Sequence, residues 1–174
     1  LSGLVVLLGF FPWGKNRWIP VLLSAVMFGL IHATNPGASV ISVIGNALGG
    51  LIYGMAFLGA RNIWFPFGLH LGWNFTQTLV GFPVSGKDFP GPLTVTSTGP
   101  DLVTGGDFGP EAGIIGILSR FLVIALLIGY LKLRYRDGSF AALRYAPDPQ
   151  KRKKKTGTQS ETSTSVDTSS PAPA

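Results

Sequence analysis

Four apolar stretches, separated by short polar or glycine- and proline-rich segments, dominate the pattern of the chain. They cover residues 18–33, 38–60, 63–82 and 114–133. A helix needs roughly 20 apolar residues to cross the hydrocarbon core of a bilayer, and each stretch is of about that length. The pattern therefore predicts an all-α fold, a polytopic bundle of about four transmembrane helices.

The segments around these stretches differ in character. Residues 1–12 are apolar but too short to span, and because the chain begins with Leu rather than Met, we expect part of a helix cut by a fragment boundary. A signal peptide is the alternative, but its basic start and cleavage site are missing. Residues 134–174 are basic and then rich in Ser and Thr, which predicts a disordered tail. Residues 13–133 are therefore the expected transmembrane domain, with an outer loop at 83–113 that is long enough to form an ordered cap.

Composition removes several classes of chemistry. Hydrophobic residues make up 46% of the chain and charged residues only 13%, which is unlike a soluble protein. The absence of cysteine excludes disulfides and thiolate catalysis. Every Asp and Glu follows residue 87, so the two apolar stretches that contain the histidines carry no carboxylate of their own.

The chain has a net charge of +6, and the positions of its basic residues indicate how it is oriented in the membrane. Five of the 14 basic residues form the run 151–155, so the charge predicts no nucleic-acid partner. If the chain crosses the bilayer at every apolar stretch, the other basic loop residues fall mainly on the side of that run. Because cytoplasmic loops carry the excess of Lys and Arg, the C-terminus is expected in the cytoplasm.

Glycines spaced four residues apart predict close packing between helices. Small residues at this spacing let two helix backbones approach each other in lipid. The pairs are Gly45 with Gly49, Gly50 with Gly54, and Gly68 with Gly72.

The only two histidines of the chain, His32 and His70, both lie in predicted membrane helices. Asn74 follows His70 by four residues, and Phe28 precedes His32 by four, so each pair shares a helix face. Ionisable side chains are costly in hydrocarbon and therefore indicate function, although a hydrogen-bonded interface histidine is the plainer alternative. H-E-x-x-H and G-x-S-x-G are both absent, so the residues alone indicate a polar intramembrane site and no more.

Two strings then resemble a known family. SAVMFGLIHATNPGAS and FPFGLHLGWNFTQ resemble the F-x-x-x-H and H-x-x-x-N motifs of the CAAX protease and bacteriocin-processing family, intramembrane proteases related to the type II CAAX prenyl endopeptidase. TGPDLVTGGDFGPEAG is similar to a loop of many bacterial members. The resemblance covers residues 18–131 and implies a protease of the bacterial plasma membrane, surrounded by lipid, that acts on a peptide or membrane-protein substrate.

The resemblance also implies roles for single residues. His32 corresponds to the histidine that activates water together with a glutamate, while His70 and Asn74 would stabilise the oxyanion. Amide hydrolysis needs such a base and such donors. Whether His32 and His70 ligate a divalent metal such as zinc, or simply hold water, stays open, and no other cofactor is expected.

One part of the family pattern is missing. The glutamates belong to an E-E-x-x-x-R motif, which this sequence does not contain. Either the motif lies upstream of the present residues, or the chain is an inactive relative. The alternatives to a protease are a non-catalytic scaffold, a bacteriocin self-immunity protein or, less in keeping with the pattern, a small-solute carrier.

Overall fold

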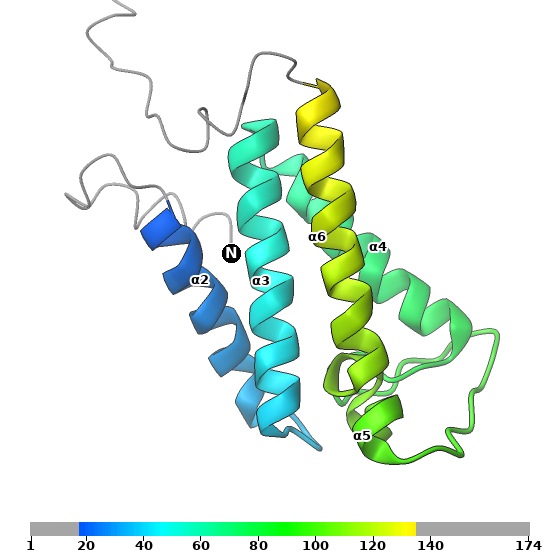
Figure 1. Ribbon diagram of the computed structural model, residues 1–174. Coiled ribbons are helices and arrows are strands. Elements are labelled where there is room, and N and C mark those ends of the chain that lie inside the picture. Colours follow the sequence, from blue (N-terminus) through cyan, green and yellow to red (C-terminus); the bar gives the residue numbers. More distant parts are fainter. Residues whose placement is uncertain (1–17, 135–174) are drawn as a thin grey trace, which may run out of the picture.

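The computed structural model describes residues 18–134, and this part of the chain is a bundle of helices without a β-strand (Figure 1). The all-α prediction is therefore confirmed for these residues, while the predictions for residues 1–12 and for the tail after Arg134 lie outside them. The long helices are α2 (Trp18–Ile31), α3 (Val40–Ala60), α4 (Trp64–Val80) and α6 (Ile114–Arg134), and the short ones are η1 (His32–Thr34), α5 (Asp101–Thr104), η2 (Gly106–Phe108) and η3 (Pro110–Ala112).

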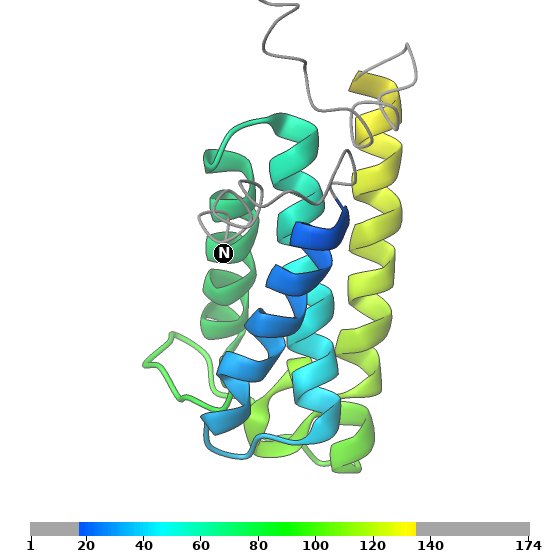
Figure 2. The same cartoon turned by 90° about the vertical axis from the view of Figure 1, so that its left-hand side faces the viewer.

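The four long helices run alternately up and down (Figures 1 and 2). The α3–α4 turn and the end of α6 lie at one end of the bundle. The α2–α3 turn and the long connection between α4 and α6 lie at the other. A chain that crosses the bilayer at every apolar stretch must have this alternating arrangement.

Local sequence sets the ends of the helices. Ser39 and Ser42 form a reciprocal capping box at the start of α3, with bonds of 2.8 and 3.1 Å between backbone N–H and side-chain oxygen. Arg61, at φ 55°, ends α3 in the left-handed region, and Gly81, at φ 91°, ends α4 in the same way. The observed helices begin and end close to the predicted stretches because these turn residues lie between them.

Helices α2 and α3 pack closely against each other. A Cβ added at Gly50 would lie 2.8 Å from the Cα of Ala25, and one at Gly54 would lie 2.8 Å from Cγ1 of Val21. The predicted role of these two glycines is therefore confirmed. The prediction for Gly68 and Gly72 is wrong among the described residues, because a Cβ at either position meets nothing within 4 Å.

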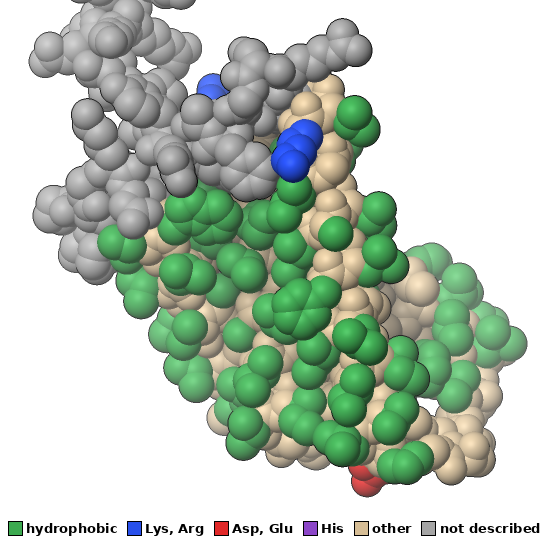
Figure 3. Space-filling model, in the orientation of Figure 1, with side chains coloured by type: hydrophobic (Ala, Val, Ile, Leu, Met, Phe, Trp, Pro, Cys, Tyr) green, Lys and Arg blue, Asp and Glu red, His purple; other side chains and the backbone are tan. Residues whose placement is uncertain are grey.

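Apolar side chains cover the outside of the bundle as well as filling it (Figure 3). Two helices, α3 and α6, are long and apolar enough to cross a bilayer. The apolar segment Trp18–Thr34 is shorter, and the 17 residues of α4 give a rise of about 25 Å at 1.5 Å per residue. Basic side chains lie where α6 ends, and an acidic one lies at the opposite end of the visible face (Figure 3).

The connection between α4 and α6 folds back onto the bundle. The backbone N–H of Gly86 donates to the carbonyl of Phe108 at 2.9 Å, and the Phe108 side chain is only 1% exposed. Asn35, in the α2–α3 turn, donates from Nδ2 to the carbonyl of Ser85 at 2.9 Å. These contacts bring parts of the outer loop against the ends of the helices that carry the histidines.

Candidate active site

His32, His70 and Asn74 line one pocket with a cavity volume of about 400 Å³. The structure thus brings together the three side chains that the sequence motifs single out, although they come from two different helical segments. The pocket lies between the end of α2, the middle of α4 and the start of the outer loop. Its other lining residues are Asn35, Leu71, Phe75, Thr78, Val84, Ser85, Lys87 and Phe89.

Phe28 lies between the two imidazoles. Its ring centroid is 4.4 Å from that of His32 and 5.6 Å from that of His70. Tyr53 of α3 lies against His70, with 4.9 Å between the ring centroids. The aromatic contact expected from the spacing of Phe28 and His32 is therefore present, and Phe28 supports the second histidine as well.

The hydrogen bond of His32 defines which of its nitrogens is available. Nδ1 lies 2.6 Å from the carbonyl oxygen of Phe28, one helical turn earlier. A carbonyl oxygen can only accept, so Nδ1 carries the proton and donates. The neutral ring then keeps its lone pair on Nε2, which is the form that a general base needs.

His70 and Asn74 meet across one turn of α4, as their spacing predicted. Asn74 Nδ2 lies 3.4 Å from His70 Nε2, and both residues line the pocket. With Asn74 donating, one N–H of its amide remains for another acceptor.

Glu111 is a buried carboxylate that the sequence reasoning missed. It comes from η3, in the outer loop, yet it is only 3% exposed. Trp73 Nε1 donates to Oε1 at 2.9 Å, Ser85 Oγ donates to Oε2, and Arg120 Nη2 lies 3.6 Å from Oε1. The histidine-bearing helices carry no carboxylate of their own, and the loop brings this one to the bundle.

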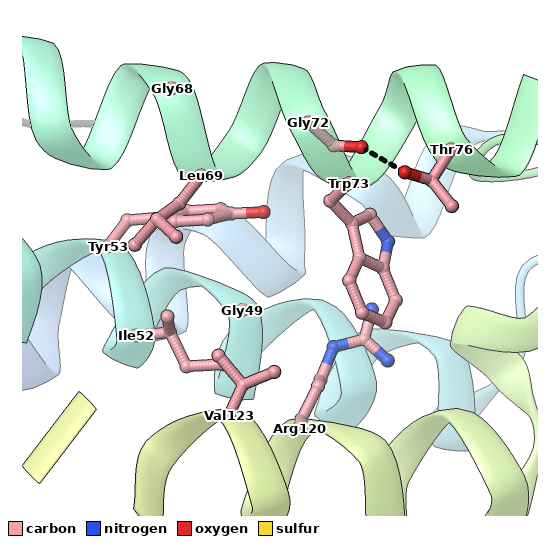
Figure 4. Close-up of a pocket in the computed structure, with 10 residues that line it drawn as sticks. All are labelled: Gly49, Ile52, Tyr53, Gly68, Leu69, Gly72, Trp73, Thr76, Arg120 and Val123. Carbon is pink, nitrogen blue, oxygen red and sulfur yellow. Dashed lines mark hydrogen bonds between the residues drawn. The ribbon is translucent and has the colours of Figure 1, made fainter. Parts of the chain in front are cut away.

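Arg120 of α6 explains why the carboxylate is buried there. Its side chain is itself buried, and its guanidinium carbon lies 5.0 Å from the centroid of the Trp73 ring. Figure 4 shows Trp73 reaching from α4 toward Arg120 at one end of a second cavity, of about 360 Å³, between α3, α4 and α6. The signal in the sequence was Arg120 itself, a lone charge in an apolar stretch that needs an acidic partner.

Ser85 connects the carboxylate to the pocket. It is 8% exposed, lines the pocket of the histidines, and donates to Glu111. Its φ of 50° lies in the left-handed region, which few residues other than glycine adopt. Such strain is maintained only where the surroundings hold the residue in place.

A metal centre is not favoured by the donor set. Residues 18–134 contain no group of three or more His, Asp or Glu side chains that could hold a metal ion. His32 and His70 would have to be completed by Asn74 or by groups outside this range.

Fold and pocket together define an integral membrane protein whose polar site lies among its helices. Residues 4–76 match the model of a family described as type II CAAX prenyl endopeptidase Rce1-like. This match spans both histidine motifs and agrees with the resemblance to the CAAX protease family. No curated protein and no solved structure matches the chain. Glu111 and Arg120 lie beyond the matched residues.

Proposed function

We propose that this protein is an intramembrane endopeptidase of the CAAX-processing type. The observation that carries the proposal is the arrangement of His32, His70 and Asn74 around one pocket. The match of residues 4–76 to the type II CAAX prenyl endopeptidase Rce1-like model supports the reaction class, hydrolysis of a peptide bond.

The geometry supplies two of the parts that amide hydrolysis needs. His32 presents Nε2 as the acceptor that deprotonates a water molecule, because its Nδ1 is committed to the Phe28 carbonyl. Asn74 keeps one amide N–H for the oxyanion that forms on the scissile carbonyl, and His70, whose Nε2 accepts from Asn74, would donate to it from Nδ1.

The resemblance to the family implies a further part, a glutamate that activates the water with His32. Glu111 is not a substitute for it. Its carboxylate already accepts hydrogen bonds from Trp73 and Ser85 and faces the Arg120 guanidinium. Both of its oxygens thus have partners, and Glu111 is not among the residues that line the pocket of the histidines. Within residues 18–134 we therefore assign the role of base to His32.

The expected setting follows from the charge distribution. Arg61, Lys132 and Arg134 lie at one end of the bundle, which would face the cytoplasm of a bacterial cell and would place the C-terminus there. Substrates would be peptides or membrane proteins that reach the pocket from the bilayer or from its outer face. Bacteriocin or peptide maturation is the precedent within the family.

A second candidate is a non-catalytic scaffold, such as a self-immunity protein that binds another membrane protein. The observation that favours it is the unpacked face of α4, where Gly68 and Gly72 meet no neighbour among the described residues. The two candidates differ in one respect that can be measured, the dependence of peptide cleavage on the pocket.

The test is an assay of the protein, expressed from its whole reading frame and reconstituted in liposomes. Internally quenched peptides ending in Cys-a-a-X would be supplied with and without a prenyl group. His70→Ala and Asn74→Ala are expected to lower kcat by about 100-fold or more, as loss of an oxyanion donor does. Gly68→Ala, on the same helix but outside the pocket, is the control and should cleave like the parent. Undiminished cleavage by both pocket variants would show that cleavage does not depend on this pocket and would overturn the proposed site.

A further inference from the structure

Ser85 is the one hydroxyl that links the pocket to the buried carboxylate. Its side chain lines the same cavity as His32, His70 and Asn74, and its Oγ–H donates to Glu111 Oε2. Thr78, the other hydroxyl-bearing residue of the pocket, has no such contact with the carboxylate.

The bond to Glu111 determines what Ser85 can offer a ligand. A hydroxyl has a single hydrogen, and here that hydrogen is committed to the carboxylate. The lone pairs of Oγ are then the only polar groups that the side chain can present to the pocket. Ser85 is therefore an acceptor in the pocket and cannot be a donor while this bond persists.

Donor groups surround the carboxylate of Glu111. Trp73 donates to its other oxygen at 2.9 Å, and Arg120 Nη2 lies 3.6 Å from the same oxygen. The indole N–H and the guanidinium can only donate, so Glu111 is the acceptor in each of these contacts. The Ser85 hydroxyl is its third donor.

The backbone holds Ser85 in place at some cost. Its φ of 50° is unfavourable for a residue with a side chain, and Asn35 Nδ2 fixes its carbonyl at 2.9 Å. The following residue is anchored too, because Gly86 N–H donates to Phe108 O at 2.9 Å. A turn that only connected α4 to the loop would be served better by glycine at this position.

We propose that Ser85 and Glu111 orient the attacking water in the pocket. The inference rests on the proposed protease function and adds an acceptor that the histidine motifs do not supply. The water donates one hydrogen to Ser85 Oγ and the other to His32 Nε2. Its lone pair is thereby turned toward the scissile carbonyl, and the hydrogen bond from Ser85 to Glu111 strengthens Oγ as an acceptor.

In the chemical step, the water O–H bond to His32 breaks and the proton moves to Nε2, while the oxygen forms a bond to the carbonyl carbon. When the tetrahedral intermediate collapses, the C–N bond breaks and the proton passes from His32 to the leaving amine. Ser85 keeps its own hydrogen throughout. Ser85 thus contacts the reacting water, and Glu111 is a positioning residue that acts through Ser85.

Two substitutions at the same position separate this role from a structural one. Ser85→Gly removes the hydroxyl but relieves the backbone strain, so the protein should remain folded. Ser85→Thr keeps the hydroxyl but places a β-branched residue at positive φ, so it should lower stability. If Ser85 orients water, Ser85→Gly lowers kcat by about 100-fold with little change in KM. Ser85→Thr retains most of the parent kcat despite its lower melting temperature.

The experiment is the liposome assay with both peptide substrates, with thermal unfolding measured in parallel and His70→Ala as the reference. Parent-like kcat in Ser85→Gly, together with loss of activity in His70→Ala, would overturn the inference and leave the protease standing. Undiminished activity in Ser85→Gly and His70→Ala alike would remove the protease itself. If activity in the Ser85 variants simply follows their melting temperatures, the residue is structural and the inference is wrong.

Discussion

Glu111 and Arg120 face each other inside the helix bundle, with 3.6 Å between Glu111 Oε1 and Arg120 Nη2 and both side chains only 4% exposed. Glu111 belongs to the outer loop and Arg120 to α6, so the contact joins a polar connection to the interior of an apolar helix. Removing either partner leaves the other charge buried without compensation.

The pair should therefore show strong coupling. Arg120→Met and Glu111→Gln are each expected to destabilise the protein by about 3–5 kcal/mol, because one buried charge then remains alone. The double variant should be markedly more stable than the sum of the single effects. Thermal or denaturant unfolding in detergent micelles measures all four proteins. Additive single effects would show that the two charges do not depend on each other.

Trp73 should contribute through its indole N–H and not only through its ring. Trp73→Phe removes the donor to Glu111 but keeps an aromatic ring near Arg120, and a lost bond to a charged group is worth about 1.5–3 kcal/mol. Trp64→Phe is the matched control on α4, because Trp64 is 74% exposed. Its effect on unfolding should stay within about 0.5 kcal/mol. Equal effects at the two positions would contradict the assigned hydrogen bond.

Glycines on α3 and α4 should respond differently to the same substitution. Gly50→Ala places a Cβ 2.8 Å from the Ala25 Cα, a backbone atom that cannot move aside, so about 1–3 kcal/mol of stability should be lost. Gly72→Ala meets nothing within 4 Å and should be neutral or stabilising, by up to about 1 kcal/mol from helix propensity. Unfolding measurements on both variants test this. A large loss at Gly72 would show that another segment packs there.

Phe28 should matter more for catalysis than for folding. Phe28→Leu keeps an apolar side chain in the core but removes the ring that contacts both imidazoles. Misplaced catalytic groups can lower rates steeply, and we expect kcat to fall about 10- to 100-fold. The melting temperature should change much less, as for other volume-similar core substitutions. Phe67→Leu, at a position that is 55% exposed on α4, serves as the control for the assay.

Chelation tests whether a metal takes part in cleavage. His32 and His70 alone do not complete a zinc site, so if no further ligand joins them, 1,10-phenanthroline should leave cleavage unchanged. Inhibition that added Zn²⁺ reverses would show that ligands from outside residues 18–134 complete a metal site with His32 and His70.

Much of the fold could be predicted from apolar length alone. The predicted stretch 38–60 corresponds to α3, Val40–Ala60, and 114–133 corresponds to α6, Ile114–Arg134. Spacing of four residues also predicted the neighbours Phe28 with His32 and His70 with Asn74, because helix geometry is local.

Glu111 could not be placed in this way. Its burial depends on how a loop folds back onto the bundle, through contacts with Trp73 and Ser85 that are 38 and 26 residues away in the sequence. The failed prediction for Gly68 and Gly72 has a similar cause. A pattern of small residues permits close packing, but only the tilt of α4 relative to its neighbours determines whether a partner is there.

The position of Glu111 just before α6 also bears on biogenesis. A ribosome delivers Trp73, Ser85 and Glu111 before it delivers Arg120, so every partner that the structure gives this arginine has been synthesised when α6 enters the bilayer. An arginine at a helix centre costs about 2.5–3.5 kcal/mol on insertion scales, and Arg120, in the second turn of α6, would carry part of that cost if it entered alone. Here Glu111 is available to pair with Arg120 when α6 enters the bilayer, and α6 can partition into lipid as an apolar segment would.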